Sequence, residues 1–259
     1  MINTINEDKE SNFLIICDHA SNRIPEQYNN LGLNGEILTT HIAYDIGVKE
    51  TATHLAKYLD CPLVMSDFSR LLIDANRGID DPTLIMKISD GEIIKGNKGI
   101  SFLINCSEKK HRIETYYNAY HNKISDIIDR SLKKNIFPAI ISIHSFTPFF
   151  GQNKRSTELG ILWDSDNRLP DIFFSYLNKN YKHLNVGNNK PYTGRMKNDT
   201  LYRHGTKQGL ANILIEIRQD LIIDSAKQKE FSKIIAKPLL ENKSNDHLFR
   251  KKFFKSLAK

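Results

Sequence analysis

Short apolar runs separated by longer amphipathic stretches restrict the fold of this chain more than any other feature. Each run is too short for a typical helix, is rich in Ile, Leu or Val, and lies near turn residues, a combination typical of buried strands. The runs are Phe13–Cys17, Leu63–Met65, Leu71–Ile73, Ala139–Ile143, Leu159–Trp163 and Ala211–Ile217. We therefore expect a sheet whose strands come from most of the chain.

The stretches between and after these runs carry apolar residues at helical spacing. They predict helices over residues 46–59, 107–134, 168–178, 225–240 and 246–257. Strands that alternate with helices predict an α/β fold, in which a mainly parallel mixed sheet is flanked by helices.

The chain shows no repeat and no break in composition, so we expect a single domain over residues 1–259. Residues 1–12 are expected to be flexible, and residues 244–259 to form a basic C-terminal helix. The stretches 76–105 and 185–209 are rich in turn residues and predict long loops, the first with a short hairpin or helix.

The basic charge of the chain does not by itself indicate a nucleic-acid partner. The formal net charge is +7, but the lysines are spread along the sequence, and the local basic cluster is Phe249–Lys255. This cluster contains no recognised nucleic-acid motif, so we expect a solvated helix face and no specific nucleic-acid partner.

Features of export and membrane insertion are missing from the sequence. Residues 1–13 are acidic and lack the apolar core of a signal peptide, and no apolar run approaches the length that crosses a bilayer. Cys17, Cys61 and Cys106 are scattered and form no CxxC pair, which is typical of a reduced compartment. We therefore expect a cytoplasmic protein without a membrane span.

Polar residues gather at the ends of four of the predicted strands. In chain order they include Asp18, His19, Asp74, Asn76, Arg77, His144, Glu216 and Arg218. Ligands of open parallel sheets bind at the carboxyl ends of the strands, so we expect these side chains to share one site.

Two histidines from separate strand ends, together with an acidic group, are typical of a catalytic zinc site. We predict His19 and His144 as zinc ligands and Glu216 as the base that accepts a proton from water. Arg77 is predicted to bind a substrate carboxylate through paired hydrogen bonds. The alternatives are that each histidine is only a hydrogen-bonded structural residue and that Glu216 pairs with a core arginine.

Five ordered segments resemble the N-formylglutamate amidohydrolase family. They are Cys17–Pro25, His41–Gly47, Ser69–Arg77, Ser142–Pro148 and Ile215–Leu221. That family is similar to zinc carboxypeptidases and aspartoacylases, so the resemblance implies a mixed α/β sheet flanked by helices, the phosphorylase/hydrolase-like fold. It also implies one zinc ion held by two histidines and a carboxylate, with a glutamate as base.

The resemblance implies further roles for individual residues. Asn76 and Arg77 would bind the carbonyl or carboxylate of the substrate, and Arg77 would also stabilise the oxyanion formed on attack. His121 would lie near the site, and His204 would bind substrate or stabilise the oxyanion. Arg70 and Arg218 are additional candidates for recognition of an anionic substrate.

The acidic zinc ligand departs from the carboxypeptidase pattern. That pattern is His-x-x-Glu, whereas the third residue after His19 is Asn22, a poor ligand for zinc. We predict Asp45 as the acidic ligand instead. The alternative for Asp45 is a role as the N-cap of the helix over residues 46–59.

The sequence as a whole predicts a zinc-dependent amidohydrolase that cleaves a small, carboxylate-bearing N-acyl amino acid. The name of the family suggests N-formylglutamate, which would yield formate and glutamate. One alternative is a related deacylase or peptidase with another acidic amide substrate. Another is a small-molecule binding protein that has lost the metal, an alternative that Asn22 keeps open.

Overall fold

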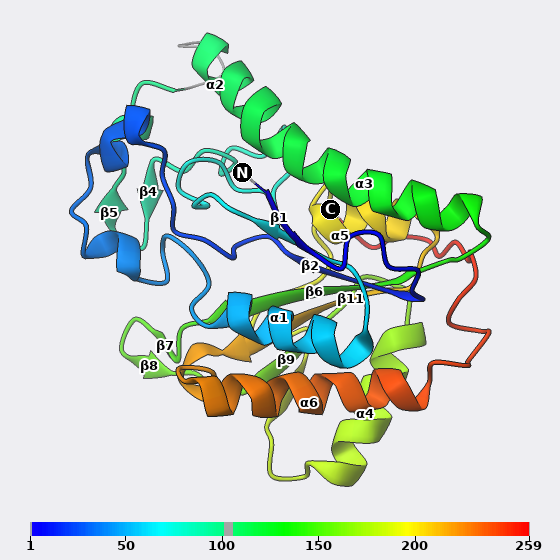
Figure 1. Ribbon diagram of the computed structural model, residues 1–259. Helices are drawn as coiled ribbons and strands as arrows, with labels where there is room; N and C mark the ends of the chain where they lie inside the picture. The colour runs from blue at the N-terminus through cyan, green and yellow to red at the C-terminus, as the bar shows by residue number, and fades with distance from the viewer. Residues whose placement is uncertain (1, 101–105, 259) are drawn as a thin grey trace.

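The computed structural model describes residues 2–100 and 106–258, and a seven-stranded sheet forms the centre of this part of the chain (Figure 1). In spatial order the strands are β1 (Ile2–Ile5), β3 (Leu63–Ser66), β2 (Phe13–Cys17), β6 (Ala139–Phe146), β11 (Asn212–Arg218), β9 (Leu159–Leu162) and β10 (Val186–Asn188). The inner strands β3, β2, β6 and β11 are parallel, as are β9 and β10. β1 and β9 run antiparallel to β3 and β11. The predicted mainly parallel mixed sheet is confirmed.

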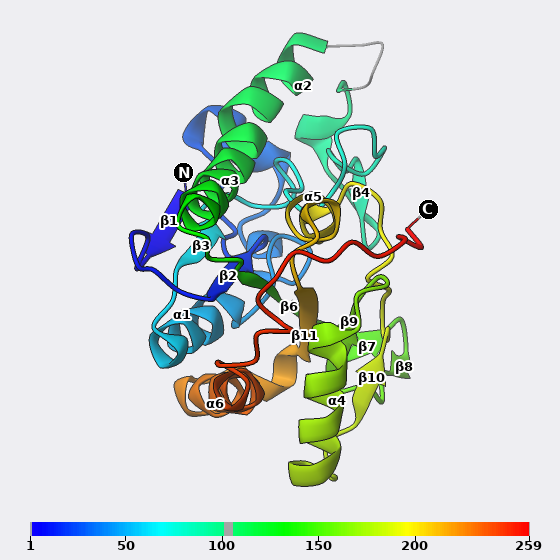
Figure 2. The same cartoon turned by 90° about the vertical axis from the view of Figure 1, so that its right-hand side faces the viewer.

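Helices cover both faces of the sheet (Figures 1 and 2). One face carries α1 (Val48–Leu59), α4 (Arg168–Asn180) and α6 (Ser225–Glu241), and the other carries α3 (Asn118–Lys133) and the short α5 (Thr200–His204). Successive side chains of a strand point to opposite faces, so Ile15 lies in the core under α1 while Leu14 and Ile16 lie in the core under α3. Among the helices that the structure describes, none is long and apolar enough to cross a membrane.

The long helix predicted over residues 107–134 is observed as one helical stretch in three parts. α2 (Cys106–Arg112) continues through a π-helical segment, Ile113–Tyr117, into α3. Segments of this kind often occur near functional sites. Here the hydroxyl of Tyr117 donates a hydrogen bond of 2.6 Å to the backbone carbonyl of Arg77, which ties the helix to a predicted substrate-binding segment.

The predicted strand over Leu71–Ile73 is wrong. These residues are fully buried, but they lie in a turn in which the backbone N–H of Leu72 donates to the carbonyl of Ser69. An apolar run of this length cannot distinguish a strand from a buried turn, because both need the same side chains. The loop after it does contain a hairpin, β4 (Ile88–Ser89) and β5 (Glu92–Ile93).

The N-terminal residues include a strand where the sequence predicted a flexible segment. Residues 2–5 form β1, which adds an antiparallel edge strand to β3. Ion pairs hold the segment that follows, from Lys9 to Asp60 at 2.6 Å and from Lys123 to Glu7 at 2.8 Å. An edge strand of this kind is held by backbone hydrogen bonds, so a polar sequence shows no side-chain pattern that would predict it.

The helix predicted over residues 246–257 is also wrong. This segment forms no helix beyond one turn, in which the N–H of Leu248 donates to the carbonyl of Asn245. Its carbonyls are bound elsewhere: the buried guanidinium of Arg168 donates to the carbonyls of Leu248 and Arg250 at 3.3 and 2.7 Å. The N–H of Lys252 donates to Gly209. These contacts satisfy the backbone groups that a helix would have used.

Candidate active site

The face of the sheet under α3 changes from apolar to polar toward the carboxyl ends of its strands. The polar residues at this edge are Asp18 after β2, Ser142 and His144 in β6, and Glu216 in β11. Each is an even number of positions from an apolar residue of the same strand that packs under α3, so all of them share one face. His144 and Glu216 are direct neighbours in the register of β6 and β11.

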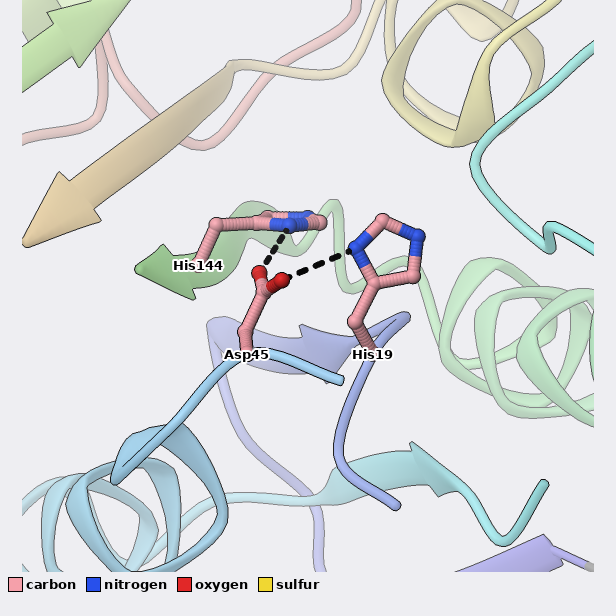
Figure 3. Close-up of side chains that lie close together, drawn as sticks. All are labelled: His19, Asp45 and His144. Atoms are coloured by element: carbon pink, nitrogen blue, oxygen red, sulfur yellow. Dashed lines mark hydrogen bonds and ion pairs between the residues drawn. The ribbon is translucent and has the colours of Figure 1, made fainter. Parts of the chain in front are cut away.

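His19, Asp45 and His144 form a buried group at this edge, here called the ligand cluster (Figure 3). His19 follows β2, His144 lies in β6, and Asp45 lies in the loop before α1. Asp45 Oδ2 is 2.9 Å from His144 Nδ1, and Asp45 Oδ1 is 3.5 Å from His19 Nδ1. One ligand atom from each residue lies within 4.8 Å of the other two. The three residues predicted as metal ligands therefore come together in space.

Backbone contacts, and not helix capping, position Asp45. Its N–H donates to the carbonyl of His19 at 3.0 Å, and its carboxylate accepts the N–H of Ser145 at 3.2 Å. The N-cap of α1 is Gly47, whose φ of 80° is a left-handed conformation that glycine adopts at low cost. The alternative that Asp45 caps this helix is thus wrong.

Two further carboxylates orient the histidine rings from behind. Asp74 Oδ1 is 2.7 Å from His19 Nε2, and Asp18 Oδ2 is 3.0 Å from His144 Nε2. Burial would raise the pKa of both carboxyls, but the histidines beside them lower it, to about 2 for Asp18 and well below its ordinary value for Asp74. Both carboxylates are therefore ionised at neutral pH and accept the Nε2 protons, which leaves each Nδ1 facing Asp45.

The ligand cluster fits a divalent metal ion such as Zn²⁺. Two imidazole nitrogens and a carboxylate are a common zinc donor set, and a ligating imidazole usually donates its other N–H to a carboxylate, as both rings do here. His19 Nδ1 is buried, and no described residue forms a hydrogen bond with it. A metal ion would give this atom a closer partner than Asp45 Oδ1, which is 3.5 Å away. Asn22 lies elsewhere and donates to the carbonyl of Leu38 at 2.8 Å.

Glu216 has the environment of a general base. Only 7% of its surface is exposed, and its Oε2 atom has no hydrogen-bond partner among the described residues. Burial is the main cause that raises its pKa, to about 7. Among the described residues, no arginine forms an ion pair with Glu216. The alternative that Glu216 only pairs with a core arginine is therefore not supported. A carboxyl with this pKa can accept and return a proton near neutral pH.

Arg70 reaches the ligand cluster but is already paired. Its Nη2 atom is 2.8 Å from Asp74, and its Nη1 atom is 3.6 Å from Asp45. The charge of Arg70 is therefore largely balanced by Asp74 and Asp45.

Arg77 keeps part of its guanidinium free. Its Nε donates to the hydroxyl of Thr83 at 3.2 Å, and its Nη1 donates to the carbonyl of Asn76 at 3.0 Å. Its Nη2 atom has no partner among the described residues, so it can donate to a bound anion. The side chain of Asn76 accepts the N–H of Thr200 at 3.2 Å, which joins this segment to α5.

The ligand cluster, Glu216, Arg70, Asn76 and Arg77 all line one cavity of ≈ 240 Å³. The cavity thus brings together the predicted metal ligands, the predicted base and three of the predicted substrate-binding residues. The rest of its wall is mixed: its polar residues are His41, Ser145, Thr147, Thr193 and Asp199, and its apolar and aromatic residues are Phe146, Leu162, Tyr192, Met196 and Leu214.

The structure places His121 and His204 behind this cavity, not in its wall. His121 Nδ1 and His204 Nε2 are 2.9 Å apart, and His121 Nε2 is 3.1 Å from the carbonyl of Ala75. Burial lowers the pKa of His121 to about 3 and that of His204 to about 4, so both rings are neutral. In this position they support the segment that carries Arg77.

Arg218 also lies outside the cavity wall. It follows Glu216 on the same face of β11, but its Nε is 2.8 Å from Asp220 and its Nη2 is 3.4 Å from Glu158. These two acidic residues hold the guanidinium at the strand end. The sequence does not predict that they pair with Arg218.

Sequence reasoning gave no role to Asp18, Asp74 and Asp199. The first two directly precede or follow strand-end residues that were singled out, and alternation along β2 is a signal for Asp18. Asp199 lines the cavity and caps α5, accepting the N–H of Tyr202 at 2.7 Å. An Asp-Thr pair ahead of apolar residues is a recognisable helix start, and it was overlooked within the predicted loop.

Gly160 is expected to be intolerant of a side chain. A Cβ atom at this position of β9 would overlap the carbonyl oxygen of Lys190 and lie 3.1 Å from Cβ of Glu216. We expect Gly160→Ala to shift the loop that carries Tyr192, to lower kcat/KM at least about tenfold, and to lower the free energy of unfolding by about 1–3 kcal/mol. Steady-state kinetics and urea denaturation measure the two effects. Gly35→Ala, where no atom lies within 4 Å, is the control, and equal behaviour of both variants would contradict the prediction.

The fold and the site together define an α/β protein with a buried group of two histidines and a carboxyl that could hold a metal ion. A model of the N-formylglutamate amidohydrolase family matches residues 11–223. The chain belongs to this family, and it is an amidohydrolase.

Solved structures resemble the chain over almost its whole length. A gene product of Agrobacterium tumefaciens is 31% identical, with a TM-score of 0.88, over 95% of this chain and 96% of that one. The N-formylglutamate amidohydrolase of Ralstonia eutropha JMP134 is 17% identical, with a TM-score of 0.71, over 95% and 98% of the two chains, and it shares the fold. A search of curated proteins finds no match.

Proposed function

We propose that the chain is a metal-dependent amidohydrolase of small N-acyl amino acids that carry a free carboxylate. The observation that supports this most directly is the common cavity of the ligand cluster, the unpaired carboxyl of Glu216 and the partly free guanidinium of Arg77. In the proposed enzyme, this arrangement would put a metal site, a base and an anion-binding group within reach of one small molecule.

The reaction divides among these residues in a simple way. A Zn²⁺ ion held by the ligand cluster would polarise the amide carbonyl and lower the pKa of water. Glu216 accepts a proton from the attacking water, so that a C–O bond forms at the carbonyl carbon. As the C–N bond breaks, Glu216 gives this proton to the leaving nitrogen. Asp74 and Asp18 keep the two imidazole rings in place throughout.

N-formylglutamate, the compound in the family name, is the first substrate to test, and its hydrolysis would give formate and glutamate. A deacylase or peptidase acting on another carboxylate-bearing amide is the alternative within the same chemistry. A panel of N-formyl, N-acetyl and dipeptide substrates, followed by amine release, separates the two. We expect turnover that is lost on chelation and restored by zinc. Lack of turnover across the panel in zinc-loaded protein would contradict the proposal.

Removal of the charge of Arg77 tests its role in binding the carboxylate. We expect Arg77→Met to raise KM about 10- to 100-fold, because a charge-assisted pair with the substrate is lost, and to change kcat less. Arg23→Met, which removes an exposed arginine that pairs with Asp67, should leave both constants unchanged. An unchanged KM in Arg77→Met would exclude Arg77 as the carboxylate site.

A further inference from the structure

The cavity offers fewer free cations than a substrate with two carboxylates requires. Among the lysines and arginines of the described residues, only Arg70 and Arg77 line it. The guanidinium of Arg70 is paired with the carboxylates of the site, which leaves the Nη2 atom of Arg77 as the free arginine donor. His41, at the rim, is paired with Asp90 at 3.2 Å. One carboxylate can therefore be matched by a free guanidinium, but a second cannot.

Two acidic groups belong to this part of the site, and one of them forms a long ion pair with Arg77. Asp81 Oδ2 is 4.0 Å from Arg77 Nε, and the buried carboxyl of Asp199 lines the same cavity. When ionised, Asp81 would repel a second carboxylate bound near Arg77, and repulsion between like charges is strong where water is partly excluded. A substrate with two carboxylates, such as N-formylglutamate, is thus poorly matched to this wall.

Part of the cavity wall is apolar, alongside the hydroxyl groups of Ser145, Thr147 and Thr193. Leu162 and Leu214 are neighbours in the register of β9 and β11, are 2% and 5% exposed, and form part of the cavity wall with Phe146. The Sδ atom of Met196 lies 3.9 Å from Arg77 Nη1. Contact with this surface removes an apolar group of the substrate from water, which favours binding. A charged group placed there would lose its hydration without gaining a partner, which disfavours binding.

We propose that this chain prefers N-acyl amino acids with one carboxylate and an apolar side chain, such as N-formylmethionine or N-formylleucine, over N-formylglutamate. The inference rests on the proposed function and names its substrate class. The side chain of an amino acid grows from the carbon that also bears the carboxylate. With that carboxylate on Arg77, the side chain meets the apolar surface that begins at Met196.

The first experiment compares kcat/KM of the zinc-loaded protein for N-formyl-L-methionine, N-formyl-L-leucine and N-formyl-L-glutamate. We expect the two apolar compounds to be hydrolysed about 10- to 100-fold more efficiently, which is the usual range of discrimination by a hydrophobic pocket. An equal or higher kcat/KM for the glutamate compound would overturn the inference while leaving the amidohydrolase proposal intact.

A second cation placed in the wall should reverse the preference. Met196→Lys puts an ammonium group beside Arg77, and we expect it to raise the ratio of kcat/KM for N-formyl-L-glutamate over N-formyl-L-methionine at least about tenfold. Leu240→Lys adds the same charge at an exposed position near the end of α6 that does not line the cavity, and should keep the wild-type ratio. An unchanged ratio in Met196→Lys would overturn the placement of the side chain.

Measurements of binding distinguish a wrong substrate preference from a wrong proposal of amide hydrolysis. The affinities of the same compounds for zinc-loaded Glu216→Gln protein are measured by calorimetry. Tighter binding of the methionine compound supports the inference even if the wild type shows no turnover, a result that would reject only the proposed hydrolysis. Tighter binding of the glutamate compound, or binding of neither, overturns the inference.

Discussion

Replacement of Glu216 by Gln is expected to lower kcat by about 10²- to 10⁴-fold, the usual contribution of a general base, with no change in metal content. The amide of Gln has nearly the same shape as the carboxyl, but it cannot accept a proton from water. The side chain has no hydrogen-bond partner at Oε2 among the described residues, so its neutral replacement should be tolerated by the fold. Steady-state kinetics and elemental analysis of the same preparation measure both quantities.

Glu158→Gln is the matched control for this prediction. Glu158 immediately precedes β9 and pairs with Arg218, and it does not line the cavity. The same chemical change there should leave kcat within about twofold, as is usual for substitutions away from a site. Full activity in Glu216→Gln would remove Glu216 as the base, and loss of metal from that variant would make it a ligand instead.

Replacement of both His19 and His144 by Ala is expected to abolish metal binding and turnover together. The wild type should contain about one zinc ion per chain, because the ligand cluster supplies three protein donors and leaves one position for water. The double variant keeps only Asp45, which cannot hold the ion alone. Elemental analysis after dialysis against metal-free buffer, with and without added zinc, gives the metal content.

A histidine outside the cluster provides the control. His183→Ala removes an exposed ring that packs on Tyr181, and it should keep the wild-type metal content. A wild type that takes up no metal even from added zinc would contradict the metal-dependent mechanism. That result would favour the alternative of a metal-free protein that binds a small molecule in the same cavity.

Local patterns in the sequence were sufficient to predict most of the elements of this fold. Phe13–Cys17 is a strand, and the helices predicted over residues 168–178 and 225–240 are present with slightly longer ends. Apolar periodicity predicts these elements because a strand or helix must bury one or both of its faces whatever its neighbours are. The position of His19 and Glu216 at strand ends was visible for the same reason.

Contacts between distant parts of the chain escaped sequence reasoning. The edge strand β1 and the extended segment after Asp246 are held by hydrogen bonds to β3, Gly209 and Arg168. Such bonds involve backbone groups that every residue carries, so the pattern of side chains does not predict them. The apolar run Leu71–Ile73 does not distinguish a strand from a buried turn, because both require the same hydrophobic residues.

The sequence by itself determined which residues could take part in the chemistry, because the parallel strands end in histidine and carboxyl side chains that are costly to bury alone. Only the tertiary structure decided where they lie relative to one another. It brings Asp45 between His19 and His144, sets Asp74 and Asp18 behind the rings, and draws His121 away from the cavity. The physical reason is that the role open to a polar side chain depends on the atoms within about 3 Å of it, the range of a hydrogen bond. These neighbours distinguish a candidate metal ligand from a positioning group or a neutral buried histidine. Strand order and packing alone set those distances.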